Sequence, residues 1–90
     1  MLYLRRVSGD SMLPNLKNGQ IILAVRTTRP KVDDVFIITH NGLEKIKRLA
    51  KTRQDEIYIL GDNPKHSTDS RTLGWLPRTV LKARVIWPRR

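Results

Sequence analysis

The chain has 90 residues, of which 39% are hydrophobic and 29% charged, and its 18 lysines and arginines against 8 acidic residues give a net charge of +10. It contains no cysteine, so a disulfide scaffold and a cysteine-based metal or redox centre are excluded. The longest apolar run, residues 21–25, is far shorter than the roughly 20 residues that cross a membrane, and residues 1–10 lack the apolar core of a secretory signal peptide. We therefore expect one folded domain, residues 1–90, without a transmembrane segment, in the cytoplasm or at the periphery of a membrane.

Six short apolar segments, separated by turn residues, predict β-strands rather than helices. In chain order they are residues 3–7, 20–25, 35–39, 43–49, 57–60 and 83–87. Asn41-Gly42 joins the third to the fourth, because this pair supplies the two positive φ angles of a type I′ hairpin turn. Helical turns are predicted at 12–16 and at 77–81, where a proline stands first. The expected fold is mostly β, a small curved sheet or barrel with one or two short helical turns.

Side chains alternate along the strand predicted at residues 43–49, which places Lys47 on the same face as Lys45 and Leu49. A partly apolar face of this kind permits a buried amine. The pattern alone nevertheless favours an ordinary solvated lysine, because a second lysine shares the face and lysines are seldom buried.

Three polar segments carry the candidate chemistry, and the second lies within the strand predicted at residues 43–49. They are Gly-Asp-Ser-Met-Leu-Pro-Asn-Leu at 9–16, Glu-Lys-Ile-Lys-Arg at 44–48, and Gly-Asp-Asn-Pro-Lys-His-Ser-Thr-Asp-Ser-Arg at 61–71. In this order they resemble three boxes of the signal peptidase I family, whose members are Ser/Lys-dyad peptidases. Self-cleaving repressors of the SOS response share the first box, and the third favours the signal peptidase side.

The resemblance implies that Ser11 is the nucleophile and Lys47 the general base. A serine hydroxyl is a weak nucleophile until a base takes its proton. A lysine can be that base when burial lowers its pKa from about 10.4. Ser67 matches the family serine that accepts a hydrogen bond from the lysine amine, and Asp69 and Arg71 resemble a supporting ion pair.

Further candidate positions concern the oxyanion, the substrate pocket and a turn. In one branch of the family a serine two positions before the nucleophile contacts the oxyanion. Gly9 stands there in this chain, which leaves the Ser11 N–H and a close backbone approach for that role. Met12 and Leu13 are candidates either to line the substrate pocket or to belong to the core. The pair Asp62-Asn63 is interpreted as a turn whose side chains bond nearby backbone.

Family members normally carry a transmembrane anchor before the nucleophile box, whereas only ten residues precede Ser11 here. The segment between the second and third boxes, residues 49–60, is also short. The chain therefore resembles a stripped catalytic core. Soluble relatives of this kind include the maturation proteases of nickel-type superoxide dismutase, which remove a short leader from one cytoplasmic client.

The function implied by the resemblance is that of a serine endopeptidase that removes an N-terminal leader or signal peptide from a protein client. Small residues are then expected just before the cut, as at Ala-x-Ala leaders, with the substrate extended beside a strand edge. No cofactor is expected. The positive charge adds either an acidic client or peripheral contact with anionic lipid.

A basic β-barrel that binds nucleic acid without catalysis is the alternative, because the charge alone suits phosphate. The candidate phosphate contacts are Arg26, Arg29, Lys31, Arg89 and Arg90. The aromatic residues are scattered, which suits core or rim positions better than a base-stacking face. A Ser-His-Asp triad that uses His40, or a metal site of His40 and His66, is disfavoured, because both histidines fall in predicted turns without ligand spacing.

Overall fold

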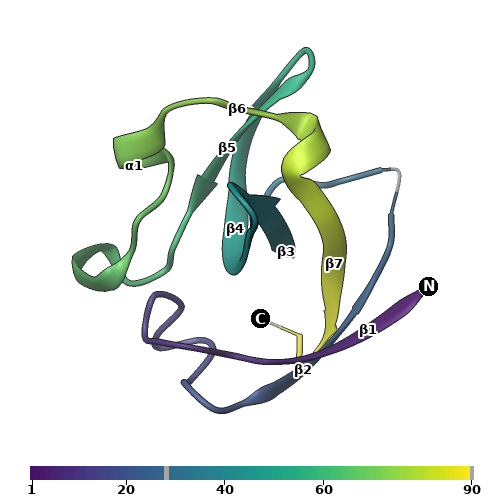
Figure 1. The fold of residues 1–90 in the computed structure, drawn as a ribbon, viewed down its shortest axis with the longest axis vertical. Coiled ribbons are helices and arrows are strands. Elements are labelled where there is room, and N and C mark those ends of the chain that lie inside the picture. The colour runs from purple at the N-terminus through teal and green to yellow at the C-terminus, as the bar shows by residue number, and fades with distance from the viewer. Residues whose placement is uncertain (28, 90) are drawn as a thin grey trace.

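The computed structural model describes residues 1–27 and 29–89, and this part of the chain folds into one antiparallel sheet (Figure 1). Its seven strands run in the order β1-β2-β7-β3-β4-β5-β6. They are β1 (Leu2–Arg6), β2 (Ile21–Val25), β3 (Val35–His40), β4 (Leu43–Arg53), β5 (Glu56–Leu60), β6 (Leu76–Pro77) and β7 (Leu81–Trp87). The short helices η1 (Pro64–His66), α1 (Ser70–Leu73) and η2 (Arg78–Val80) lie between β5 and β7. The predicted fold class is confirmed.

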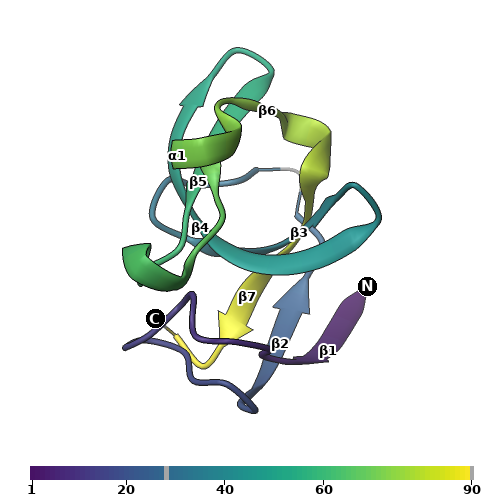
Figure 2. The same ribbon diagram turned by 60° about the vertical axis from the view of Figure 1, so that its left-hand side comes forward.

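The central strand β3 has apolar side chains buried on both of its faces. Val35 and Ile37 point into one core, which β2 and the loop after β1 complete. Phe36 and Ile38 point into a second core, shared with β4 and β5. Alternation along a single strand produces this division. Figure 2 shows the result: β4 crosses the molecule between a half that holds β1 and β2 and a half that holds β5, β6 and α1, and β7 runs from the second half into the first.

The six predicted strands are confirmed, with one large change of bounds. β4 continues to Arg53 because its second half pairs with β5. The hairpin between β3 and β4 is confirmed by the positive φ angles of Asn41 (52°) and Gly42 (76°). β6 was not predicted, because two residues are too few to show the alternation of a strand.

Both predicted helical turns are present. Residues 12–16 form a single turn that does not extend into a helix: the Met12 carbonyl accepts hydrogen bonds from Asn15 N–H at 2.9 Å and from Leu16 N–H at 3.0 Å, and Pro14 has no N–H to continue a ladder. The turn predicted at 77–81 is present as η2, one residue shorter at each end. Among the described residues, none of the helices is long and apolar enough to cross a membrane.

Candidate active site

Lys47 lies in the middle of β4, and its side chain is 4% exposed. It shares a face of the strand with Leu49, which belongs to the core between β4 and β5. Burial lowers the pKa of the Lys47 amine below its ordinary 10.5. The Asp69 carboxylate opposes this shift, whereas the cations Lys45 and Arg71 add to it. The solvated lysine favoured by the strand pattern is therefore wrong, because the chain after β5 covers this face.

Asp69 is fully buried and anchors a hydrogen-bond network that ends at Lys47. Its carboxylate accepts hydrogen bonds from Gly61 N–H at 2.7 Å, from the Ser67 hydroxyl at 2.8 Å, and from the amide and guanidinium of Arg71. Burial by itself raises the pKa of Asp69, but these hydrogen bonds outweigh it and lower the pKa to about 2. Ser67 Oγ in turn accepts a hydrogen bond from Lys47 Nζ at 2.9 Å.

The direction of these hydrogen bonds determines which part of the Lys47 amine stays available. Ser67 has a single hydroxyl proton, and an ionised carboxylate can only accept, so that proton is committed to Asp69. Ser67 must therefore accept from Lys47. A neutral amine held in this way donates one N–H to Ser67 and keeps its lone pair for another partner. This arrangement suits a general base.

Gly61 brings the Ser11 backbone against this network. A Cβ placed on Gly61 would lie 2.1 Å from Ser67 Oγ and 2.8 Å from the carbonyl oxygen of Ser11. Both atoms therefore lie against its bare α-carbon, where only glycine leaves room. The Ser11 carbonyl also accepts a hydrogen bond from Asn63 N–H at 2.8 Å. Within residues 1–27 and 29–89 no hydrogen bond joins Ser11 Oγ directly to Lys47 Nζ.

The side chains of Asp62 and Asn63 do not bond backbone that is near them in the sequence, contrary to the interpretation of this pair as a simple turn. Asp62 accepts hydrogen bonds from Arg48 at 2.9 and 2.8 Å and from Asn15 at 2.7 Å. The Asn63 side chain donates to the carbonyl of Asp10 at 3.0 Å. These contacts fasten the loop after β1 to β4 and to the segment after β5. Figures 1 and 2 both show that loop lying against the η1 segment.

The backbone before the candidate nucleophile is fixed by Gly9. Its φ of 86° lies in the left-handed region that favours glycine, and its N–H donates to Asn18 Oδ1 at 2.9 Å. By contrast, the Ser11 N–H donates no hydrogen bond within the described part of the chain. That amide is free to donate to a bound group.

A pocket of about 80 Å³ opens beside Ser11. Residues 5–8 form one wall and residues 44–46 of β4 form the other. Met12 contributes to the lining and is also 1% exposed in the core under β1 and β2, so it lies both at this pocket and in the core. Leu13 is not among the lining residues. The pocket therefore lies between the strand that precedes Ser11 and the strand that carries Lys47.

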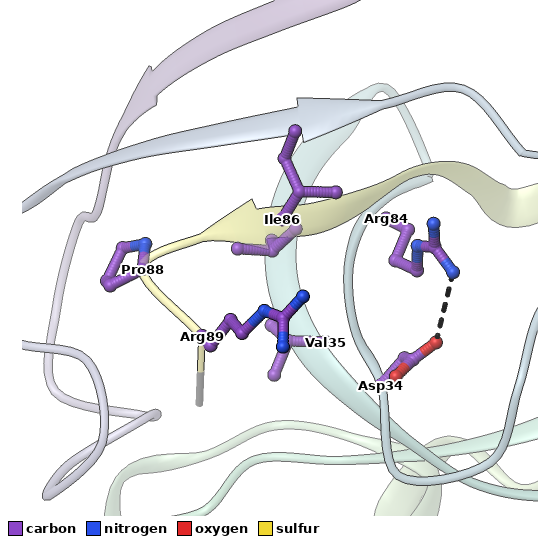
Figure 3. A pocket seen from close by; sticks show the side chains of 7 residues that line it. Asp34, Val35, Arg84, Ile86, Pro88 and Arg89 are labelled. Atoms are coloured by element: carbon purple, nitrogen blue, oxygen red, sulfur yellow. Dashed lines mark ion pairs between the residues drawn. The ribbon is translucent and has the colours of Figure 1, made fainter.

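A larger pocket, of about 400 Å³, lies elsewhere and shares no lining residue with the first. It is formed by residues 34–35 and the end of β7 (Figure 3). Arg89, a candidate phosphate contact, lines it, and Arg84 faces Asp34 at 3.8 Å. Arg90 falls outside the described residues. Among the aromatic residues, Phe36 is in the core, an edge-to-face contact joins Tyr58 to Trp75, and Trp87 is 56% exposed.

The histidines that a triad or metal site would need lie at the ends of elements, His40 in β3 and His66 in η1. Neither side chain makes a hydrogen bond in the part of the chain that is described. In the same part, no three His, Cys, Asp or Glu side chains gather as metal ligands would.

Acid is expected to destabilise the fold through Asp69. Its pKa of about 2 lies below its ordinary 3.8, so its stabilising contribution is complete above 3.8 and disappears as the pH falls through about 2. The contribution is about 2 kcal/mol. Urea unfolding of wild type and Asp69→Asn should show this portion of the pH dependence in the wild type alone. Glu44 also has a pKa of about 2, but it is present in both proteins and contributes equally to both. Equal acid dependence of the two proteins would therefore contradict a stabilising contribution from Asp69.

Most of the chain matches the model of a known family. The model of the family described as Peptidase S24-like matches residues 1–73, a range that contains Ser11, Lys47 and the network around Asp69. No curated protein matches the chain.

Proposed function

The chain belongs to the Peptidase S24-like family, and on this premise we propose that it is a serine endopeptidase in which Ser11 is the nucleophile and Lys47 the general base. Its task is to remove a leader or signal peptide from a protein client. The main support is the buried Lys47 amine, whose hydrogen bond to Ser67 leaves its lone pair free. Burial lowers the pKa of this amine, so more of it is neutral near neutral pH than of an exposed lysine.

Peptide hydrolysis then proceeds in two halves. Ser11 Oγ attacks the carbonyl carbon of the scissile bond while its proton moves to Lys47 Nζ. The tetrahedral intermediate collapses, the C–N bond breaks, and Lys47 returns the proton to the leaving amine. A water molecule next attacks the acyl ester on Ser11 and gives a proton to Lys47. Collapse of the second intermediate frees the carboxyl product and returns the proton to Ser11 Oγ.

The oxyanion of each intermediate needs a donor close to the nucleophile. The Ser11 N–H has no partner within the described residues and is the group we assign to this role. Gly9 contributes by conformation, because its left-handed backbone is held by Asn18 and has no side chain to obstruct the oxyanion.

We place the substrate between two strand edges, that of β1 and that of the first half of β4. In the described sheet β1 pairs only with β2, and residues 43–47 of β4 pair only with β3, since the pairing with β5 begins at Arg48. Both free edges border the pocket beside Ser11. An extended leader can add there as a strand, with main-chain hydrogen bonds for affinity and side-chain pockets for selection. Family resemblance favours small residues just before the cut.

The test is a cleavage profile. Wild type and Ser11→Ala are incubated with a diverse peptide library, and the new termini are identified by mass spectrometry. Cuts made by wild type and absent with Ser11→Ala are expected. If neither protein cuts a peptide or a leader-bearing client, and both bind RNA or DNA with a steep dependence on salt, the nucleic-acid alternative replaces the peptidase.

A further inference from the structure

The two walls of the pocket beside Ser11 are joined by an ion pair. Arg5, on β1, donates from Nε to Glu44 Oε1 at 2.8 Å and from Nη2 to Oε2 at 3.2 Å. Glu44 is on β4, 39 positions away in the sequence. The pair therefore connects the two free strand edges between which the substrate is placed. It is a two-point contact between a planar guanidinium and a carboxylate, the geometry that arginine provides and lysine does not.

Glu44 has a second cationic partner outside this pair. Lys82, on β7, donates to Glu44 Oε2 at 2.8 Å. These contacts, first the hydrogen bond from Arg5 and then that from Lys82, lower the pKa of Glu44 to about 2, so its carboxylate is ionised at neutral pH. If Arg5 turned away, Glu44 would still be paired.

The pocket wall carries more positive than negative charge. Arg5, Arg6 and Lys45 line it, and Glu44 is the acidic residue in the lining. One carboxylate is thus shared between two cations, and two more cations lie beside it. A surplus of this kind attracts an acidic group to the pocket.

The ion pair is also easy to open. The side chains of Arg5 and Glu44 are 36% and 34% exposed, and partly exposed pairs contribute little to stability. A substrate carboxylate that reached Arg5 would therefore replace Glu44 at small cost and receive the same two-point contact.

We propose that Arg5 is a specificity-determining residue that selects an acidic side chain in the substrate by exchanging Glu44 for the substrate carboxylate. This selection rests on the peptidase function proposed above, and it identifies the client as a protein whose leader is acidic near the cleavage site.

The position of the selected side chain follows from the strand. Glu44 precedes Lys47 by three positions on β4, and a strand rises roughly 3.3 Å per residue. A substrate strand lying alongside would therefore place the acidic residue about three positions from the bond that is cut.

The experiment uses a library peptide that wild type cuts and Ser11→Ala does not. It is resynthesised with Glu or Gln at each of the positions around the third from the cut. At one position we expect kcat/KM of wild type to be about tenfold higher for Glu than for Gln, a difference that falls at high salt. Arg5→Gln should abolish this ratio, and Arg5→Lys should keep part of it. Arg26→Gln is the matched control, because it removes the same charge from an exposed site outside the pocket and should keep the full ratio.

A ratio near one at every position, or a ratio that survives Arg5→Gln, overturns the selection by Arg5 while the peptidase function stands. A ratio that Arg26→Gln reduces as much as Arg5→Gln also overturns it, because net charge alone would then explain the preference. If wild type cuts nothing that Ser11→Ala spares, the peptidase function fails and the selection falls with it. Thermal unfolding of each variant confirms that the comparison is between folded proteins.

Discussion

Lys47→Arg is expected to lower kcat/KM by about 10²–10⁴-fold, the usual contribution of a positioned general base. A guanidinium stays protonated at every pH at which the protein is folded, so it cannot take the Ser11 proton. Lys47→Met is expected to lose as much, because it keeps the apolar stem and removes the base. The measurement is peptide cleavage by matched amounts of the three proteins. Substantial activity in Lys47→Arg would remove Lys47 from the role of base.

The pH profile provides an independent check on the same group. The base must be neutral, and burial places the pKa of Lys47 below 10.5. Wild-type kcat/KM should therefore rise with pH through that lowered pKa and level off below the pH at which an exposed lysine titrates. A rise centred at the ordinary lysine value would contradict the lowered pKa, even if Lys47 proved essential.

Stability separates a catalytic lysine from a structural one. Because the folded pKa of Lys47 is lower than the unfolded one, the unfolded chain binds more protons between the two values, and wild-type stability rises with pH there. Lys47→Met lacks this rise and avoids the cost of burying an amine. We expect it to unfold at a temperature no lower than wild type near neutral pH. A large loss of stability in Lys47→Met would instead indicate that the amine mainly supports the fold.

Alternation and turn chemistry were enough to predict most of the sheet. The strand at 35–39 could be placed from its apolar run, and Asn41-Gly42 located the hairpin that follows it. The burial of Lys47 could not be predicted, because alternation assigns a side chain to a face of the strand but does not show which segment covers that face. The cover comes from residues 61–71, which are irregular apart from two short helices.

The short helix α1 was not predicted, although the sequence around it carries a local signal. Asp69 is the N-cap of α1 and Gly74, with φ 77°, ends it, a pair that marks a short helix between them. The partners of Asp62 had none, since Arg48 and Asn15 are distant in the sequence and a turn aspartate usually bonds its own neighbourhood. The sequence also gave no sign of the pairing of Arg5 with Glu44, because this contact depends on how the curled sheet brings β1 beside β4.

Gly61→Ala is expected to abolish most activity and to destabilise the fold by about 1–3 kcal/mol, the usual cost of overpacking. The added Cβ would meet Ser67 Oγ at 2.1 Å, Ser67 Cβ at 2.6 Å and the Ser11 carbonyl oxygen at 2.8 Å. The carbonyl belongs to backbone, and the Ser67 hydroxyl is held between Lys47 and Asp69, so relief requires the network or the Ser11 backbone to move. A 1 Å displacement of a reacting group can cost on the order of 10²-fold in rate.

Gly42→Ala is the control that separates this effect from a general loss of stability. Gly42 has a φ of 76° and open space where a Cβ would stand, so alanine there strains the hairpin turn without touching Ser11 or Ser67. Both variants should unfold at lower temperature than wild type, measured by circular dichroism. Only Gly61→Ala should lose cleavage when both are assayed well below their unfolding temperatures. Equal activities of the two variants would show that the close approach of Ser11 and Ser67 at Gly61 is not what arranges the site.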